Sequence, residues 1–137
     1  MLDSGLPIIV GDDEMLLSFI CQRDHYALQN SRVKYSAFIP SKKHRNKSVF
    51  RNVASADAIR ETWNRLPPQQ RPLKAGAAVA ARDVRDAELD VLSDEPPLRH
   101  ANIEGWFWDD SDDESTKAKQ KVSALAIADR AQLILLG

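Results

Sequence analysis

The chain has 137 residues, of which 43% are hydrophobic and 28% charged, and its formal net charge is −1. This length predicts one domain that buries a core without needing a disulfide or metal staple. No run approaches the roughly 18 apolar residues of a membrane-spanning helix. The pI of about 6.3 lies well below the value above 9 that is typical of a dedicated nucleic-acid-binding domain.

The single cysteine, Cys21, has no partner for an internal disulfide, which favours a reducing compartment. The first residues lack the basic flank and apolar run of a secretory signal. We therefore expect a cytoplasmic protein without a membrane segment.

The first third of the chain predicts a short strand or an extended entry segment over residues 6–10, and then a helix over residues 14–23. Asp12 and Asp13 offer N-caps for this helix. Its expected apolar stripe is Leu16, Leu17, Phe19 and Ile20.

Two segments rich in β-formers follow, residues 33–39 and 48–51. They predict an antiparallel hairpin with a polar, basic tip. Ser55 is then the expected N-cap of a helix over residues 56–66, in which Ile59 and Trp63 should be buried against a sheet.

The alanines and alternating charges of residues 75–92 suit a helix, but two short strands, residues 75–80 and 88–92, around an irregular turn at 82–87 are favoured. An acidic loop follows Trp108, and a helix is expected from about residue 117 to 135. Together these elements predict a single α+β domain over residues 1–137, a mostly antiparallel sheet with two or three helices packed on one side.

The run from Leu98 to Trp108 holds the residues best suited to chemistry. As a strand it places His100, Asn102 and Glu104 on one face and apolar residues on the other. An imidazole and a carboxylate on one face can share a proton, while the alternative is a hydrogen-bonded structural histidine beside a solvated glutamate. Arg51 is expected either to extend to water or to bind an anion.

A basic stretch precedes the second strand of the expected hairpin, and aromatic residues flank it. Cations beside aromatics suit a phosphate backbone, although such clusters are also common on solvated loops. The residues expected to bind nucleic acid are Lys42, Lys43, Arg45 and Lys47.

The charges are unevenly distributed along the chain. Seven cations and no acidic residue lie between Asp24 and Asp57, whereas twelve carboxylates face two arginines from Asp83 to Glu114. An unpaired acidic loop beside aromatic residues is typical of a protein-binding patch, so we expect a protein partner or a homodimer, while the alternative is a loop that only aids solubility. The patch consists of Trp106, Phe107, Trp108, Asp109 and Asp110.

Three short motifs carry a resemblance: Val-Lys-Tyr-Ser-Ala-Phe at 33–38, Ser-Val-Phe-Arg at 48–51, and His-Ala-Asn-Ile-Glu-Gly-Trp at 100–106. In this order and spacing they resemble a group of small uncharacterised bacterial proteins of similar length. The resemblance implies a bacterial or mobile-element setting and transfers no functional residue.

Two functions follow as hypotheses. The leading one is a non-enzymatic binding or accessory protein from a bacterial defence or toxin-type operon. The alternative is a small phosphodiester hydrolase with His100 as general acid or base, assisted by Glu104 and Arg51. Neither requires a cofactor or a metal, and glycine-rich phosphate loops, paired CxxC motifs and nucleophile elbows are absent from the sequence.

Overall fold

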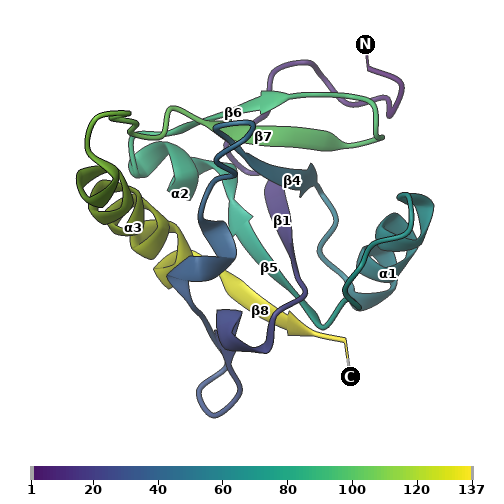
Figure 1. The fold of residues 1–137 in the computed structure, drawn as a ribbon. Helices are drawn as coiled ribbons and strands as arrows, with labels where there is room; N and C mark the ends of the chain where they lie inside the picture. Colours follow the sequence, from purple (N-terminus) through teal and green to yellow (C-terminus); the bar gives the residue numbers. More distant parts are fainter. Residues whose placement is uncertain (1, 137) are drawn as a thin grey trace.

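The computed structural model describes residues 2–136 as a six-stranded sheet with helices on both faces (Figure 1). The strand order is β6-β7-β4-β1-β5-β8, and neighbouring strands pair antiparallel. A second, two-stranded sheet joins β2 to β3. The elements in chain order are β1 (Met15–Ile20), the 3₁₀ turn η1 (Arg23–His25), β2 (Tyr26–Ala27), β3 (Arg32–Val33), the 3₁₀ turn η2 (Tyr35–Phe38), β4 (Lys47–Arg51), α1 (Ala56–Arg65), β5 (Ala75–Ala80), α2 (Ala81–Asp86), β6 (Asp90–Ser93), β7 (His100–Glu104), α3 (Asp113–Arg130) and β8 (Gln132–Leu135).

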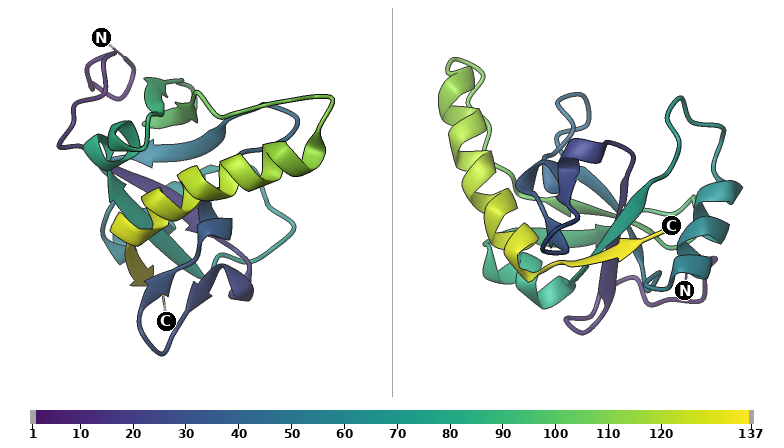
Figure 2. Two further views of the ribbon diagram at one scale, coloured as in Figure 1. Left: turned by 90° about the vertical axis from the view of Figure 1, so that its left-hand side faces the viewer. Right: turned by 90° about the horizontal axis from the view of Figure 1, so that it is seen from below.

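The expected α+β class with a mostly antiparallel sheet is confirmed, but the helices do not share one side. The right-hand view of Figure 2 shows α3 and α1 on opposite sides of the sheet. Ala124 and Ile127 of α3 belong to the larger core, whereas Ile59 of α1 packs into a separate core with Leu17 and Phe50. Within residues 2–136, no helix has the length and apolar content to cross a bilayer.

The helix predicted over residues 14–23 is wrong, because Met15–Ile20 forms β1 at the centre of the sheet. β1 is covered on both faces, so Leu16, Leu17 and Ile20 are all fully buried. A strand buried on both faces gives a continuous apolar run, which hydrophobic periodicity does not distinguish from a buried helix.

The predicted hairpin between residues 33–39 and 48–51 is also wrong. Residues 48–51 do lie in a strand, but β4 pairs with β1 and β7. Residues 35–38 form η2, which inserts Phe38 into the core, and the Ser18 hydroxyl donates to the Ala37 carbonyl over 3.0 Å. High β-propensity reflects a residue that suits a half-buried surface, and a 3₁₀ turn against a sheet supplies such a surface.

Helix α1 confirms the helix predicted over residues 56–66, with Ser55 as its N-cap. The Ser55 hydroxyl accepts a hydrogen bond from the Ala58 amide over 3.2 Å, satisfying one of the free N–H groups of the first turn. Ile59 is fully buried as expected, but Trp63 is only half-buried, packed edge-on against Phe19 with 5.0 Å between ring centroids.

In the second half of the chain, the observed helices and strands differ from the predicted ones mainly in where they begin and end. Strands β5 and β6 confirm the two expected strands, while the irregular turn between them is the short helix α2. Helix α3 begins four residues earlier than expected, where Asp112 caps it, and ends at Arg130. The remaining apolar residues form β8, which pairs with β5 at the sheet edge.

Candidate functional site

Strand β7 places its residues on two faces as predicted, with Ala101 and Ile103 fully buried. The His100 side chain is only 12% exposed. Its Nδ1 lies 2.8 Å from the carbonyl oxygen of Asp94, so this nitrogen donates, and its ring meets Phe50 edge-on with 5.4 Å between centroids. These contacts are those of an enclosed, hydrogen-bonded histidine.

Glu104 does not assist His100. The two residues lie at opposite ends of β7, and four steps along a strand span roughly 13 Å. The Glu104 carboxylate instead accepts a 3.2 Å hydrogen bond from the Asn46 amide. An imidazole and a carboxylate at this separation cannot share a proton.

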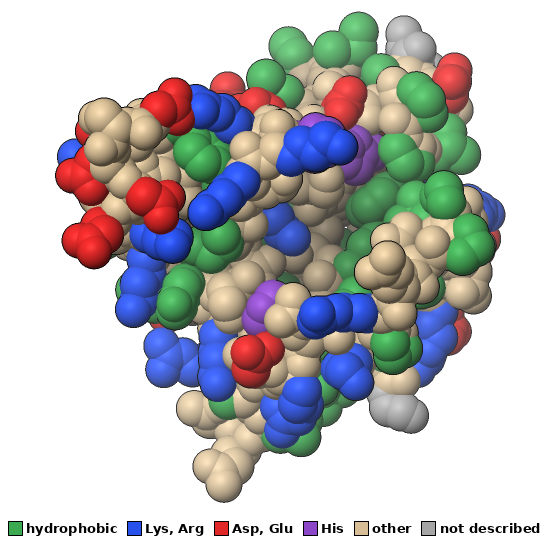
Figure 3. Space-filling model, viewed as in Figure 1, with side chains coloured by type: hydrophobic (Ala, Val, Ile, Leu, Met, Phe, Trp, Pro, Cys, Tyr) green, Lys and Arg blue, Asp and Glu red, His purple; other side chains and the backbone are tan. Residues whose placement is uncertain are grey.

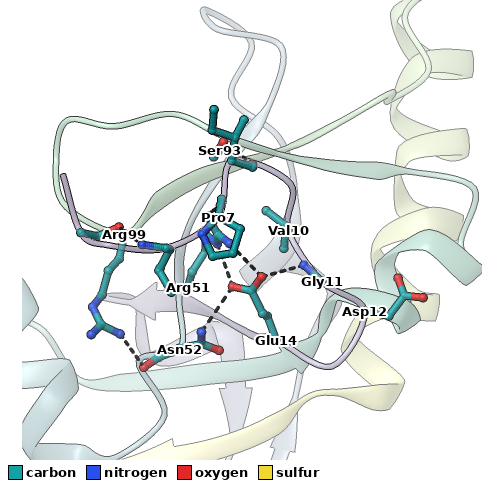
Figure 4. A network of polar contacts seen from close by, with 12 residues as sticks. Pro7, Val10, Gly11, Asp12, Glu14, Arg51, Asn52, Ser93 and Arg99 are labelled. Atoms are coloured by element: carbon teal, nitrogen blue, oxygen red, sulfur yellow. Dashed lines mark hydrogen bonds and ion pairs between the residues drawn. The ribbon is translucent and has the colours of Figure 1, made fainter. Parts of the chain in front are cut away.

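Arg51 does not extend to water, as one prediction had it, but is fully buried (Figure 4). Its Nε and Nη2 donate to the two carboxylate oxygens of Glu14, each over 2.8 Å, and its Nη1 donates to the Pro7 carbonyl over 2.8 Å. Burial acts to raise the pKa of Glu14, but the hydrogen bonds from Arg51 and the Gly11 amide outweigh it and hold the pKa below its usual value. With these donors occupied, Arg51 is a structural anchor, and the structure does not bring the three expected catalytic residues together.

The acidic loop folds back onto the basic loop, so the premise that it is unpaired is wrong. Asp110 lies 2.5 Å from Arg45, whose guanidinium also stacks over Trp108 at 4.9 Å. Lys42 lies 3.9 Å from Asp113. Two of the four residues expected to bind nucleic acid are therefore already paired.

The aromatic residues beside this loop differ in exposure. Trp106 is buried, with its indole N–H donating to the Ile103 carbonyl over 2.9 Å. Phe107 is 37% exposed beneath the Lys119 ammonium, and Trp108 is half-buried. A protein partner or homodimer at this patch stays a prediction.

A cleft of about 680 Å³ lies between α1 and the turn that connects β6 to β7. Three of its four charged lining residues are engaged by neighbours: Arg65 pairs with Glu61, and the Arg99 guanidinium donates to the Asn52 carbonyl, while the fourth, Asp3, is exposed. Since its walls carry both signs of charge, the cleft does not by its chemistry indicate a ligand.

A different set of side chains converges where the end of β1, the start of β4 and the segment before β5 approach one another. We call it the Lys47 cluster. The positive charges of Lys47, Arg71 and Lys74 each act to lower the pKa of the Cys21 thiol. Those of Lys47 and Arg71 also act to lower the pKa of His25. The cluster consists of Cys21, His25, Lys47, Arg71 and Lys74.

The three cations of this cluster have no carboxylate within 4.0 Å among residues 2–136. Within the described residues, ten of the 19 Lys and Arg residues take part in ion pairs, all of them outside the cluster. Figure 3 shows Lys and Arg side chains around a hollow in the middle of the face seen in Figure 1, while Asp and Glu gather near the start of α3. The Lys47 cluster thus brings positive charge together without internal compensation.

Burial governs the protonation of this cluster. It lowers the pKa of Lys47 to about 8, because the half-buried ammonium is densely surrounded by protein. Burial also raises the pKa of the Cys21 thiol, although the neighbouring cations oppose this shift. For His25, burial lowers the pKa, Asp24 opposes the change, and Lys47 and Arg71 add to it.

Only Lys47 was among the residues expected at a site. The other four residues gave no local signal of a site, because sequence separation hides a cluster assembled from three segments of the chain. Among residues 2–136 no group of three or more His, Cys, Asp or Glu side chains is arranged to hold a metal ion. The grouping of three cations around one cysteine is a three-dimensional signal that no local pattern contains.

No family model, curated protein or solved structure matches this chain. The resemblance drawn from the three motifs therefore stays a prediction.

Proposed function

We propose that this protein is a non-catalytic binding protein whose Lys47 cluster holds nucleic acid. The observation that carries the proposal is that Lys47, Arg71 and Lys74, none of which has a carboxylate within 4.0 Å among residues 2–136, all lie near enough to Cys21 to act on the pKa of its thiol. Like charges brought together repel one another, and a polyanion relieves that repulsion while releasing its own counterions.

The expected nucleic-acid residues change accordingly. Lys47 is retained, while Lys42 and Arg45 are engaged by the acidic loop. Lys43 is exposed and is not in the cluster. The bacterial accessory setting is a separate proposal that genomic neighbours would test, since an accessory protein is usually encoded beside its partner.

Fluorescence anisotropy with single-stranded DNA and RNA, at increasing salt, tests the binding proposal. The wild type should bind at low salt, and the triple variant Lys47→Met/Arg71→Gln/Lys74→Gln should bind weakly. Because each phosphate contact on a single strand contributes about 0.7 to the salt slope, losing three contacts should flatten it by roughly 2.

The matched control removes three positive charges outside the cluster, with Lys34→Gln, Lys119→Gln and Lys121→Gln together. Lys119 and Lys121 lie over the rings of Phe107 and Tyr35. An equal loss of affinity in this control, or no binding by the wild type at low salt, would contradict the proposal.

The hydrolase alternative is tested separately. If His100 were a general acid or base, His100→Ala would abolish phosphodiester cleavage while the fold persisted. On the binding proposal, His100→Ala leaves nucleic-acid affinity unchanged and lowers the melting temperature, since the change removes the contacts to Asp94 and Phe50.

A further inference from the structure

The acidic loop, residues 109–114, meets the basic loop, residues 41–46, through side chains alone. Two ion pairs and one guanidinium stacked on an indole ring join these segments: Arg45 with Asp110, Lys42 with Asp113, and Arg45 with Trp108. Among residues 2–136, no backbone group of one loop is hydrogen-bonded to the other loop. The two loops can therefore separate without breaking a backbone hydrogen bond.

Each loop holds its shape by its own hydrogen bonds. In the basic loop, the Ser41 amide donates to the Asn46 carbonyl over 2.9 Å, and the Arg45 amide donates to the Ser41 carbonyl over 2.8 Å. In the acidic loop, the Asp112 amide donates to the Asp109 carbonyl over 3.1 Å. Because these bonds lie within the loops, the basic loop keeps its cations in place for another ligand when the acidic loop leaves.

The contact between the loops is weak by its chemistry. All four side chains of the two ion pairs are more than half exposed. Exposed pairs of this kind are screened by salt and contribute little to stability. A hollow of about 190 Å³ remains between the loops, lined by Lys42 and Arg45 from one loop and by Asp110 and Asp113 from the other. The acidic loop thus covers the basic loop without being closely packed on it.

The covered cations continue the positive charge of the Lys47 cluster. The basic loop leads directly into β4, so the Cα atoms of Arg45 and Lys47 are at most about 7 Å apart. Lys43 is exposed and has no carboxylate within 4.0 Å among residues 2–136. When the acidic loop is displaced, Lys42 and Arg45 become free cations on the same stretch of chain.

We propose that the acidic loop is a latch over the basic loop, and that nucleic acid displaces it and binds along the chain from Lys42 to Lys47. This inference rests on the proposed function of the Lys47 cluster. Carboxylates of the latch hold cations that phosphates hold in the complex, and a nucleic acid competes well because it carries many phosphates and releases counterions as it binds. The latch lowers the affinity of the resting protein for nucleic acid, because binding must first open it.

Neutralising the latch should tighten nucleic-acid binding. The latch variant, Asp110→Asn/Asp113→Asn, removes both ion pairs. Its affinity for single-stranded DNA at low salt should exceed that of the wild type by roughly 2- to 30-fold, the factor that two exposed ion pairs supply. The matched control, Asp13→Asn/Glu61→Gln, changes the net charge equally by breaking two other exposed ion pairs. The control should gain much less affinity, because those pairs do not cover the basic loop.

Zero-length cross-linking with a carbodiimide follows the latch in the wild type, without any variant. The reagent joins a carboxylate to an amine in contact with it, and the Lys42 amine lies 3.9 Å from Asp113. The same carboxylate lies 3.1 Å from Lys117 within α3, which provides an internal control. Adding single-stranded DNA should lower the yield of the Lys42–Asp113 product relative to the Lys117–Asp113 product, as measured by mass mapping of the joined peptides.

Failure of the latch and failure of the proposed function give different results. Equal affinity of the latch variant and the control, or a cross-link ratio that bound DNA leaves unchanged, would overturn the latch alone. No binding of single-stranded DNA or RNA by the wild type, the latch variant or the control at low salt would overturn the proposed function and the latch with it.

Discussion

The two ends of strand β4 each carry a cation into the protein, and the protein treats the two differently. Arg51 at the C-terminal end is fully buried and held by both oxygens of Glu14. Lys47 at the N-terminal end, on the same face, is half-buried and has no carboxylate partner among residues 2–136. One strand therefore contains a compensated charge and an uncompensated one.

The difference separates a structural role from a functional one. A buried charge is tolerated when it is paired and hydrogen-bonded, as Arg51 is, and costs stability when it is not. An uncompensated cation that lowers stability is typical of a binding or reactive site, where stability is commonly given up for function.

The largest effect should come from removing the paired cation. Arg51→Met leaves Glu14 without its main partner, and breaking a buried pair from one side costs about 3–5 kcal/mol of unfolding free energy. Urea denaturation of the variant and the wild type measures the loss. Replacing both residues with apolar side chains should recover much of it, and a single variant as stable as the wild type would remove Arg51 from its role as an anchor.

Acid should weaken the Arg51–Glu14 ion pair at the same end of β4. The folded pKa of Glu14 is below its unfolded value of 4.5, so the carboxylate stabilises the fold above that value and the contribution is lost as the pH falls through the folded pKa. Stability should therefore fall more steeply below pH 4.5 in the wild type than in Glu14→Gln. Parallel slopes in the two proteins would contradict this.

At the other end of β4, removing the cation should raise the unfolding free energy instead of lowering it. Lys47→Met removes an uncompensated charge and should raise the unfolding free energy by about 1 kcal/mol at pH 7 while weakening ligand binding. Because folding lowers the pKa of Lys47 from 10.5 to about 8, the cost is fully present below pH 8 and disappears as the pH rises toward 10.5. Urea denaturation at pH 7 and pH 10 tests this, and a variant that is less stable at both values would sink the comparison.

The smallest effect should come from the exposed pair Arg45–Asp110. Both side chains are more than half exposed, and exposed ion pairs contribute roughly 0.2–1 kcal/mol and weaken with salt. A double-mutant cycle with Arg45→Gln and Asp110→Asn should give a coupling energy in this range. A larger, salt-independent coupling energy would mean that this pair behaves like the buried Arg51–Glu14 pair and not like an exposed ion pair.

The sequence by itself determined the elements whose signals are local. Ser55 and the spacing of Ile59 predicted α1, since a helix cap and a helical stripe depend on residues within a few positions. The alternation around His100 predicted β7 and its two faces, because side chains alternate along any strand. The α+β class followed from such elements in combination.

Only the tertiary structure decided the rest, because it depended on contacts between distant residues. Residues 15–20 form a strand since layers on both sides bury them, and their apolar run has no period of its own. Arg51 is an anchor because the fold brings Glu14 to it across 37 positions. Lys47 is left uncompensated for the converse reason: the folded chain gathers Arg71 and Lys74 near Cys21 but directs its carboxylates elsewhere, and charge compensation in space is not a property of any one segment.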